Sequence, residues 1–274
     1  MQRPRLVGDA IFLQDDGWSV GQYGWYTLHT AYQPIFSLEG AQTRIYGAEG
    51  LARPRLDDFA LPPPAFFSAI PKKDQIFVDM LCRALQFRNF RHIKGDYPHL
   101  FINLDTQIYS DPDEMVYQFG VMIEKMAGIG IDPAKIVCEI TETRESSSEM
   151  LRRIVENLRT PGIRVAVDDF GAAFSNLKRV LDVGPDIVKL DRVWANALLA
   201  HEPKALERTI GEFLDTSISV LYEGVETQEQ LAFAENNGCS LAQGFLLARP
   251  FIPTSQTEAE TLAGPEAAGL DKAG

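Results

Sequence analysis

Two adjacent aspartates, Asp168 and Asp169, end the short apolar stretch "VAVDD" at residues 165–169. Like charges side by side at the end of a buried strand repel each other and lose solvation. Adjacent carboxylates are also a natural bridge between two divalent cations about 3.5–4 Å apart, the arrangement used for in-line attack on phosphate esters. The pair therefore points to a metal-dependent phosphodiesterase or phosphatase, provided that other ligands reach the same place.

Polar side chains also lie at the ends of most other predicted strands. They are Asn103, Glu139, Glu142, Lys189, Asp191, Glu223, Glu226 and Gln243, together with Glu49 and Arg53 in a strand near the N-terminus. Each of them alone has an ordinary structural explanation, such as a helix cap or a satisfied buried amide. Roughly six carboxylates on one rim, however, would repel one another without a counter-charge. Carboxylates with one amide are hard oxygen ligands, which suit Mg²⁺, Mn²⁺ or Ca²⁺ better than a zinc thiolate site would.

The elements that would position these side chains alternate along the chain. The pattern predicts an antiparallel hairpin from residues 31–38 and 43–53, followed by a long amphipathic helix at residues 73–90. Further strands are predicted at 99–105, 135–141, 163–169, 186–191, 219–225 and 240–246, and further helices at 112–127, 146–159, 175–182, 192–215 and 227–236. This order predicts an α/β fold, a modified TIM (β/α)8 barrel with an antiparallel first strand. Active sites of such barrels lie at the C-terminal ends of the parallel strands.

One domain is expected for the 274 residues. Residues 1–28 are predicted to form an irregular lead-in with a short hairpin, and residues 29–253 the barrel. Residues 254–274 are rich in Ala, Gly, Glu and Thr, so they are predicted to be a disordered tail. The three cysteines, Cys82, Cys138 and Cys239, fit reduced core residues better than a disulfide framework or a zinc site.

The charge of the chain limits its partners. A net charge of −12 argues against binding to nucleic acid polymers or to anionic membranes. No apolar run is long enough to span a bilayer and no signal-peptide core is present, so a cytoplasmic location is expected.

Two other classes of barrel enzyme fit less well. Amidohydrolase-type barrels depend on histidines, whereas the four histidines here suit surface or packing roles, and enolase-type barrels need a capping domain.

The motifs are specific enough to indicate a family. The segments "YQPI", "EGLAR", "INLD", "CEITET", "VDDFG", "DIVKLD", "YEGVET" and "AQGFLLARP" occur in this order between about Tyr32 and Pro250. In these segments the chain resembles the EAL domains, bacterial phosphodiesterases that hydrolyse cyclic di-GMP to linear pGpG. The family fold is a modified TIM barrel with an antiparallel first strand, in agreement with the predicted hairpin. The resemblance also implies two Mg²⁺ or Mn²⁺ ions as cofactors and Ca²⁺ as an inhibitor.

The resemblance implies a role for each matching residue. Glu49, Asn103, Glu139 and Asp168 are similar to the ligands of one metal, while Asp168, Asp169 and Glu223 would hold the second. Lys189 would hold the attacking water or a phosphate oxygen, and Glu223 would act as base or metal ligand; the implied catalytic set is Lys189, Glu223, Glu49 and Asp169. The substrate would contact Gln33, Leu51, Arg53, Glu226 and Gln243, and the site would be supported by Glu142, Asp191, Ala173 and Ser175.

Two departures from the family pattern stand out. Gly50 replaces the alanine of the naming Glu-Ala-Leu motif, and in the loop after Asp169 the sequence "GAAFSNL" has Ala173 in place of a glycine and Asn176 in place of a serine. In the family, this loop is associated with a homodimer interface, and the glutamate matching Glu142 holds it. If the missing glycine had a positive φ, Ala173 would strain the loop; with an ordinary φ, alanine is harmless.

Three functions remain open at this point. The first is an active cyclic di-GMP phosphodiesterase, because each aligned catalytic position carries the family residue. The second is a non-catalytic or weakly active cyclic di-GMP receptor that signals through a partner, for which only the altered loop speaks. The third is a barrel that acts on another phosphate ester, which Gln33, Arg53 and Gln243 make less favoured.

Overall fold

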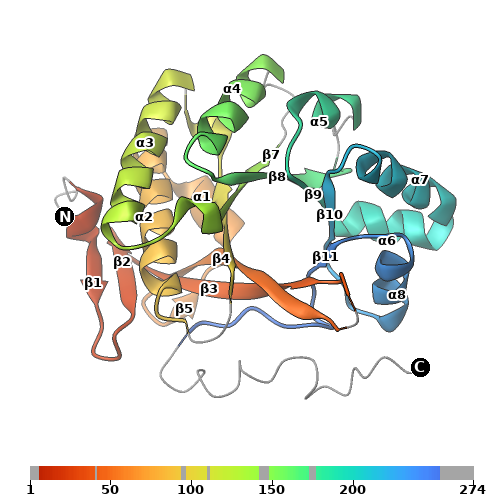
Figure 1. The fold of residues 1–274 in the computed structure, drawn as a ribbon. Coiled ribbons are helices and arrows are strands. Elements are labelled where there is room, and N and C mark those ends of the chain that lie inside the picture. Colours follow the sequence, from red (N-terminus) through yellow and green to blue (C-terminus); the bar gives the residue numbers. More distant parts are fainter. Residues whose placement is uncertain are drawn as a thin grey trace.

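The computed structural model describes residues 6–40, 42–93, 97–109, 112–141, 148–172 and 177–253. Its centre is a closed barrel of eight strands (Figure 1). Around the barrel the strands follow the order β3 (Tyr26–Ser37), β4 (Arg44–Leu56), β6 (His99–Leu104), β7 (Ile136–Thr141), β8 (Arg164–Phe170), β9 (Ile187–Leu190), β10 (Ser219–Tyr222) and β11 (Leu241–Ala242). Strand β3 is antiparallel to both of its barrel neighbours, and the remaining pairs are parallel. The predicted modified TIM barrel is confirmed.

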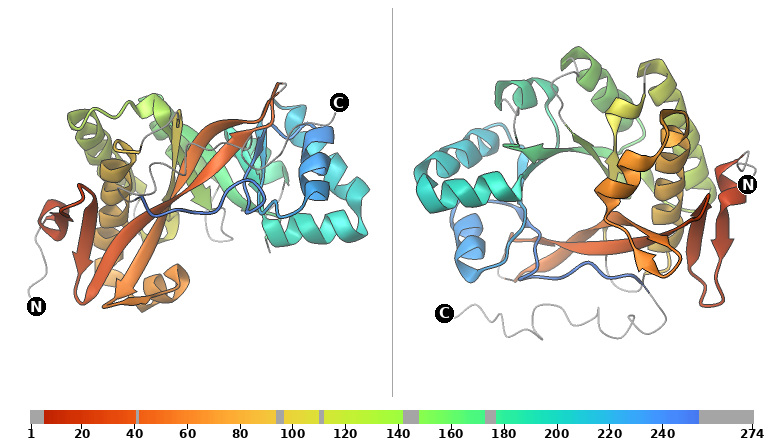
Figure 2. Two further views of the ribbon diagram at one scale, coloured as in Figure 1. Left: turned by 90° about the horizontal axis from the view of Figure 1, so that it is seen from below. Right: turned by 180° about the vertical axis from the view of Figure 1, so that it is seen from behind.

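The first hairpin is longer than predicted. Strand β3 begins at Tyr26 rather than at residue 31, because its outer end pairs with the small hairpin of β1 (Ile11–Leu13) and β2 (Ser19–Tyr23). Strand β4 continues to Leu56, where it pairs with the short β5 (Phe59–Ala60). A 3₁₀ turn, η1 (Val7–Ala10), precedes β1. The segment formed by η1, β1 and β2 packs outside the barrel beside α2 (Lys72–Phe90) (Figure 2). The described part of the lead-in thus extends the sheet.

The helices cover the outside of the barrel. Besides α2 they are α1 (Pro63–Ala69), α3 (Pro112–Gly128), α4 (Ser148–Arg159), α5 (Leu177–Val183), α6 (Arg192–His201), α7 (Pro203–Leu214) and α8 (Gln228–Asn236), with 3₁₀ turns η2 (Thr106–Ile108) and η3 (Pro133–Lys135). The prediction of one helix over 192–215 is wrong. Glu202, with φ −140° and ψ 56°, breaks it, and Pro203 then starts α7 at a position where a missing N–H costs nothing.

The last barrel strand is shorter than predicted. Instead of a strand over 240–246, β11 contains only Leu241 and Ala242, and the chain then bends over the end of β10. The Val225 N–H donates to the Gln243 carbonyl, and the Leu246 N–H donates to the Val225 carbonyl, each at 3.0 Å. A Cβ at Gly244 would lie 2.1 Å from the Val225 oxygen, so this approach requires glycine. The bend forms one wall of the site described below.

The barrel interior is filled by a layer of apolar side chains. These are Ile35, Phe101, Val137, Ala166, Ile187, Leu221 and Leu241, all nearly inaccessible to solvent. A second and larger core lies between the strands and the surrounding helices. The three cysteines are free and buried in the protein, as predicted. Among the described helices none is sufficiently long and apolar to cross a membrane.

Candidate active site at the C-terminal end of the barrel

A polar layer lies directly above the apolar layer of the barrel interior. Side chains of a strand alternate between its two faces, so the residue two positions beyond an inward-facing residue also faces inward. Phe101, Val137, Ala166, Ile187, Leu221 and Leu241 are followed at this spacing by Asn103, Glu139, Asp168, Lys189, Glu223 and Gln243. In the antiparallel β3 the order is reversed, and Gln33 precedes Ile35. The two-residue alternation of each strand thus places these polar residues at the same rim of the barrel.

Lys189 is the centre of this polar layer. Its side chain is only 1% exposed, and its ammonium nitrogen lies within ion-pairing distance of four carboxylates. The Nζ–oxygen distances are 2.6 Å to Glu139, 2.9 Å to Glu223, 3.0 Å to Asp168 and 3.8 Å to Glu49. The second oxygen of Glu49 accepts a hydrogen bond of 2.9 Å from Gln243 Nε2. The structure therefore brings residues in, or directly after, six different strands into one contact network.

The charges of this network are unbalanced. Burial alone would lower the pKa of Lys189, but the surrounding carboxylates outweigh burial and raise it well above its ordinary value. Burial raises the pKa of Glu139, and it raises the pKa of Glu223 to about 8 although Lys189 opposes the shift. Glu139 Oε2 is buried and has no hydrogen-bond partner among the described residues. One ammonium group is therefore too little positive charge for the carboxylates that surround it.

A β-bulge in β8 turns both aspartates to the same rim. In a regular strand, Asp168 and Asp169 would point to opposite faces. The pairing of β8 with β9 shifts between Val167 and Phe170, and Asp169 adopts a left-handed conformation with φ +56°. The Asp169 N–H donates to Asp168 Oδ1 at 3.0 Å. Aspartate tolerates this conformation better than most residues do, so the bulge accounts for the position of the adjacent pair.

The rim offers a ligand set that fits divalent cations. Asp168, Asp169 and Glu223 each present a carboxylate oxygen, and these oxygens lie within 4.8 Å of one another. Asn103 is exposed at the rim and is in register with Glu139 on the neighbouring strand. The ligand atoms are oxygens, as Mg²⁺, Mn²⁺ or Ca²⁺ prefers, and Glu139 Oε2 has no hydrogen-bond partner among the described residues. The residues present therefore fit the metal that the sequence predicts.

A pocket of about 240 Å³ opens beside this rim. Five of its lining residues were predicted from the sequence, namely Gln33, Glu49, Glu223, Glu226 and Gln243. The sequence analysis missed the other four, which are Arg192, Phe245 and the glycines Gly224 and Gly244. Arg192 Nη1 pairs with Glu226 Oε1 at 3.0 Å. Phe245 is 47% exposed, and the Arg249 guanidinium lies 4.4 Å from the centre of its ring. The strand-end position of Arg192, directly after Asp191, was a signal that could have found it.

The remaining predicted residues lie further from the pocket. Leu51 and Arg53 share the face of β4 with Glu49 but do not line this pocket. Arg53 donates from Nη1 to the Ala52 carbonyl at 2.9 Å, and burial lowers the pKa of its guanidinium. Asp191 caps α6 by accepting a hydrogen bond of 2.7 Å from the Trp194 N–H, so it fixes the helix that begins with Arg192. Predicted support residues outside the described part of the chain are Glu142, Ala173 and Ser175.

Gly50 makes room for a buried side chain of α2. A Cβ at Gly50 would lie 2.9 Å from Cγ of Gln86, and the Gln86 Nε2 donates to the Gly50 carbonyl at 2.7 Å. The Gln86 carbonyl in turn accepts a hydrogen bond of 2.6 Å from the Tyr32 hydroxyl. Gln86 therefore fixes the backbone next to Glu49, and glycine provides the space it occupies.

Gly50→Ala is expected to lower the free energy of unfolding by about 1 kcal/mol, because the new methyl group would displace Gln86. Chemical denaturation measures this change. Gly211→Ala in α7 is the matched control, since a Cβ there meets no atom within 4 Å and alanine favours a helix. An unchanged stability of Gly50→Ala would show that Gln86 yields without cost.

Comparison with known proteins supports the assignment of the family. The sequence model of the EAL-domain family matches residues 26–250, so the chain belongs to this family. Among curated proteins, the chain is 30% identical over 226 residues to the probable cyclic di-GMP phosphodiesterase PdeB of Escherichia coli, covering 80% of this chain and 42% of PdeB. It is 29% identical over 229 residues to the cyclic di-GMP phosphodiesterase RocR of Pseudomonas aeruginosa, covering 80% of this chain and 56% of RocR. The chain thus spans about half the length of these relatives.

Solved structures of EAL proteins resemble this fold. The Bacillus subtilis protein YkuI, in complex with c-di-GMP and calcium, has a TM-score of 0.72 and 28% identity, covering 89% of this chain and 63% of that chain. The manganese and cyclic di-GMP complex of Klebsiella pneumoniae BlrP1 at pH 6 has a TM-score of 0.70 and 28% identity, covering 81% and 56%. A standalone EAL protein of Vibrio cholerae in its c-di-GMP bound form gives 0.70 and 26%, covering 81% and 92%.

Proposed function

We propose that this chain is a metal-dependent phosphodiesterase that hydrolyses cyclic di-GMP to linear pGpG. The observation that carries the proposal is the buried Lys189 ammonium, which lies within 3.0 Å of Glu139 on β7, Asp168 on β8 and Glu223 directly after β10. Such a concentration of charge is costly to the fold and is characteristic of a reaction centre. The names of the relatives and the ligands of the similar structures support the substrate.

Two groups of residues would hold the metals. Glu49, Asn103, Glu139 and Asp168 would bind the first ion. Asp168, Asp169 and Glu223, whose carboxylate oxygens lie within 4.8 Å of one another, would bind the second. Divalent cations at this rim would lower the pKa of a water molecule and neutralise charge on the phosphate oxygens. Mg²⁺ or Mn²⁺ is the proposed physiological ion, and Ca²⁺ is proposed to bind without supporting turnover.

Lys189 and Glu223 would divide the proton chemistry between them. Because the pKa of Lys189 is raised, its ammonium group keeps its proton and would donate a hydrogen bond to the attacking water or to a phosphate oxygen. Glu223 lies in the wall of the pocket beside Lys189, so its carboxylate is placed to accept the proton of the water. Gln243 would keep Glu49 oriented through the hydrogen bond to Oε2. Attack of the water on phosphorus would break one P–O ester bond of the ring and give linear pGpG, which keeps this phosphate at its end.

Phe245 would bind a guanine base of the substrate. An exposed aromatic ring at the edge of a polar pocket offers a face for stacking, and base–aromatic stacking contributes about 1–3 kcal/mol. Phe245→Ala is therefore expected to raise KM roughly tenfold while kcat changes little. Phe59→Ala is the control, because Phe59 is 76% exposed and does not line this pocket. If kcat fell by a similar factor while KM stayed constant, the result would contradict a binding role for Phe245.

Turnover and binding assays in parallel test the function. Purified protein is incubated with cyclic di-GMP and either Mn²⁺, Mg²⁺, Ca²⁺ or EDTA, and pGpG is followed by chromatography. Formation of pGpG with Mn²⁺ or Mg²⁺, and none with EDTA, is the expected result. Tight binding of cyclic di-GMP in EDTA without turnover under any condition would instead identify the chain as a receptor. Turnover of simple phosphate monoesters but not of cyclic di-GMP would overturn the proposed substrate.

A further inference from the structure

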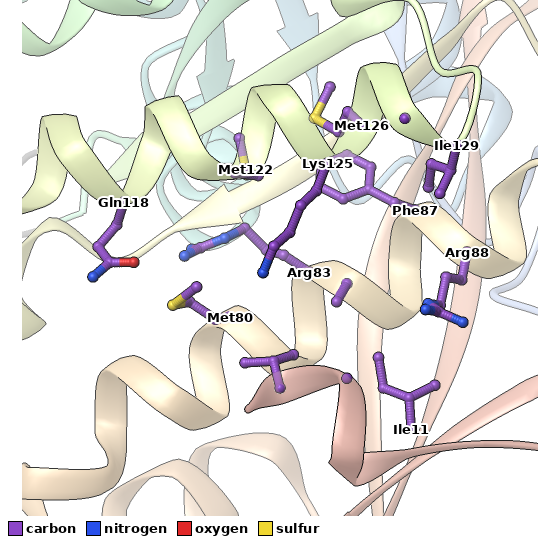
Figure 3. Close-up of a pocket in the computed structure, with 14 residues that line it drawn as sticks. Ile11, Met80, Arg83, Phe87, Arg88, Gln118, Met122, Lys125, Met126 and Ile129 are labelled. Atoms are coloured by element: carbon purple, nitrogen blue, oxygen red, sulfur yellow. The ribbon is translucent and has the colours of Figure 1, made fainter. Parts of the chain in front are cut away.

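A second cavity lies outside the barrel, and none of the rim residues lines it. It has a volume of about 460 Å³ and lies between α2 and α3, with η1 and β1 at one side (Figure 3). Helix α2 contributes Met80, Ala84 and Phe87, and α3 contributes Met122 and Met126. Small-molecule sites typically have volumes of roughly 300–1,000 Å³, so the cavity is large enough for a ligand.

The lining of this cavity is adaptable. Three of the six methionines of the chain, Met80, Met122 and Met126, contact it, and Phe87 and Ile129 complete the apolar wall. Unbranched thioether side chains adjust their rotamers to the shape of a flexible apolar partner at low cost. An aliphatic chain is therefore the apolar group that fits this lining best.

The charged residues of the lining all have the same sign. They are Arg83, Arg88 and Lys125, and no aspartate or glutamate lines the cavity, although the whole chain has a net charge of −12. Arg83 is buried and already paired with Asp79, and it donates to the Tyr109 hydroxyl at 3.1 Å. Arg88 and Lys125 are exposed, and neither has a carboxylate partner within the described residues. Figure 3 shows Lys125 reaching from α3 toward α2.

We propose that this cavity binds an amphipathic anion, a single aliphatic chain that ends in a carboxylate. The chain would lie between the methionines of α2 and α3, and the carboxylate would lie at the opening between Lys125 and Arg88. Burial of each methylene group provides the affinity. Lys125 and Arg88, which have no carboxylate partner among the described residues, select the sign of the head group. This site is independent of the barrel rim and does not require turnover of cyclic di-GMP.

Isothermal titration calorimetry of the whole chain with decanoate tests the proposal. Wild-type protein is expected to bind decanoate and to bind decyltrimethylammonium, which has the same chain length and the opposite charge, at least about tenfold more weakly. The Lys125→Glu/Arg88→Glu variant is expected to lose at least about tenfold in decanoate affinity, because it replaces attraction with repulsion. Lys204→Glu, at an exposed position of α7, should retain wild-type affinity.

Two results would overturn the proposal. One is the absence of decanoate binding by the wild-type protein, with circular dichroism showing that it is folded. The other is decanoate affinity that falls as much in Lys204→Glu as in the Lys125→Glu/Arg88→Glu variant, which would indicate a general charge effect. Filling the cavity by Ala84→Trp gives an independent readout, since it should reduce binding of decanoate while the charges stay in place.

Discussion

Replacement of Glu49 by alanine is expected to abolish hydrolysis of cyclic di-GMP, with a fall in kcat of at least about a thousandfold. The substitution removes a proposed metal ligand, and it also removes the acceptor for Gln243 Nε2 at 2.9 Å. Initial rates of pGpG formation at saturating Mn²⁺ measure the effect. Binding of Mn²⁺, followed by calorimetry, should weaken in parallel, because the same carboxylate serves both.

The control for this variant is Glu207→Ala. Glu207 is exposed on α7, so its removal changes the net charge by the same amount without touching the rim. It should leave both kcat and Mn²⁺ affinity unchanged. If Glu49→Ala kept the wild-type rate while remaining folded, the assignment of the metal site to this rim would be wrong.

Replacement of Lys189 by methionine is expected to have a second large effect, on both activity and stability. It leaves the carboxylates of Glu139, Glu223 and Asp168 without the cation that lies within 3.0 Å of each. Breaking a buried ion pair by removing one partner costs about 3–5 kcal/mol, and urea denaturation in EDTA should show a loss of this size. Activity should also fall, because no ammonium group remains to bind the water or a phosphate oxygen.

The pH dependence of this variant follows from the raised carboxyl pKa values. Burial is the main cause that raises the pKa of Glu223 from 4.5 to about 8 in the metal-free protein. Between these two pH values the folded state therefore holds a proton that the unfolded state releases. Its contribution to stability is present at low pH and is lost as the pH rises through about 8. Without Lys189 the loss should be larger, and the stability deficit in EDTA should grow from about pH 5 to above pH 8.

Lys204→Met is the control for the removal of a lysine, because Lys204 is exposed on α7. Its stability should match that of the wild type at each pH. Addition of Mn²⁺ should restore part of the stability of Lys189→Met, since a divalent cation can replace the missing positive charge. A stability deficit that is independent of both pH and Mn²⁺ would indicate a packing defect in place of unpaired carboxylates.

Much of the candidate site could be predicted because the C-terminal ends of the parallel strands meet at one end of a barrel. Glu139, Asp168 and Lys189 were each placed near such an end, and in the structure the two-residue period of the strands turns all three to the interior. The close contacts of Lys189 with carboxylates from the neighbouring strands follow from that register. The class of barrel was also predictable, because strands and helices that alternate along the chain permit few arrangements.

Other features depend on contacts that a sequence pattern does not contain. Asp169 shares the rim with Asp168 only because of the bulge and its positive φ, whereas a regular strand would separate them. Phe245 lines the pocket because the chain bends after β11, and the bend depends on the close approach of Gly244 to Val225. The break at Pro203 was readable in the sequence, because proline fits the first turn of a helix and not its interior, yet a single helix over 192–215 was predicted.

Hydrolysis of cyclic di-GMP in water enriched in oxygen-18 tests the central claim most directly. The account predicts that, with Mn²⁺ or Mg²⁺, mass spectrometry will detect linear pGpG carrying one labelled oxygen on its terminal phosphate, and that EDTA will prevent its formation. Intact cyclic di-GMP after prolonged incubation with active metal and folded protein would contradict the account.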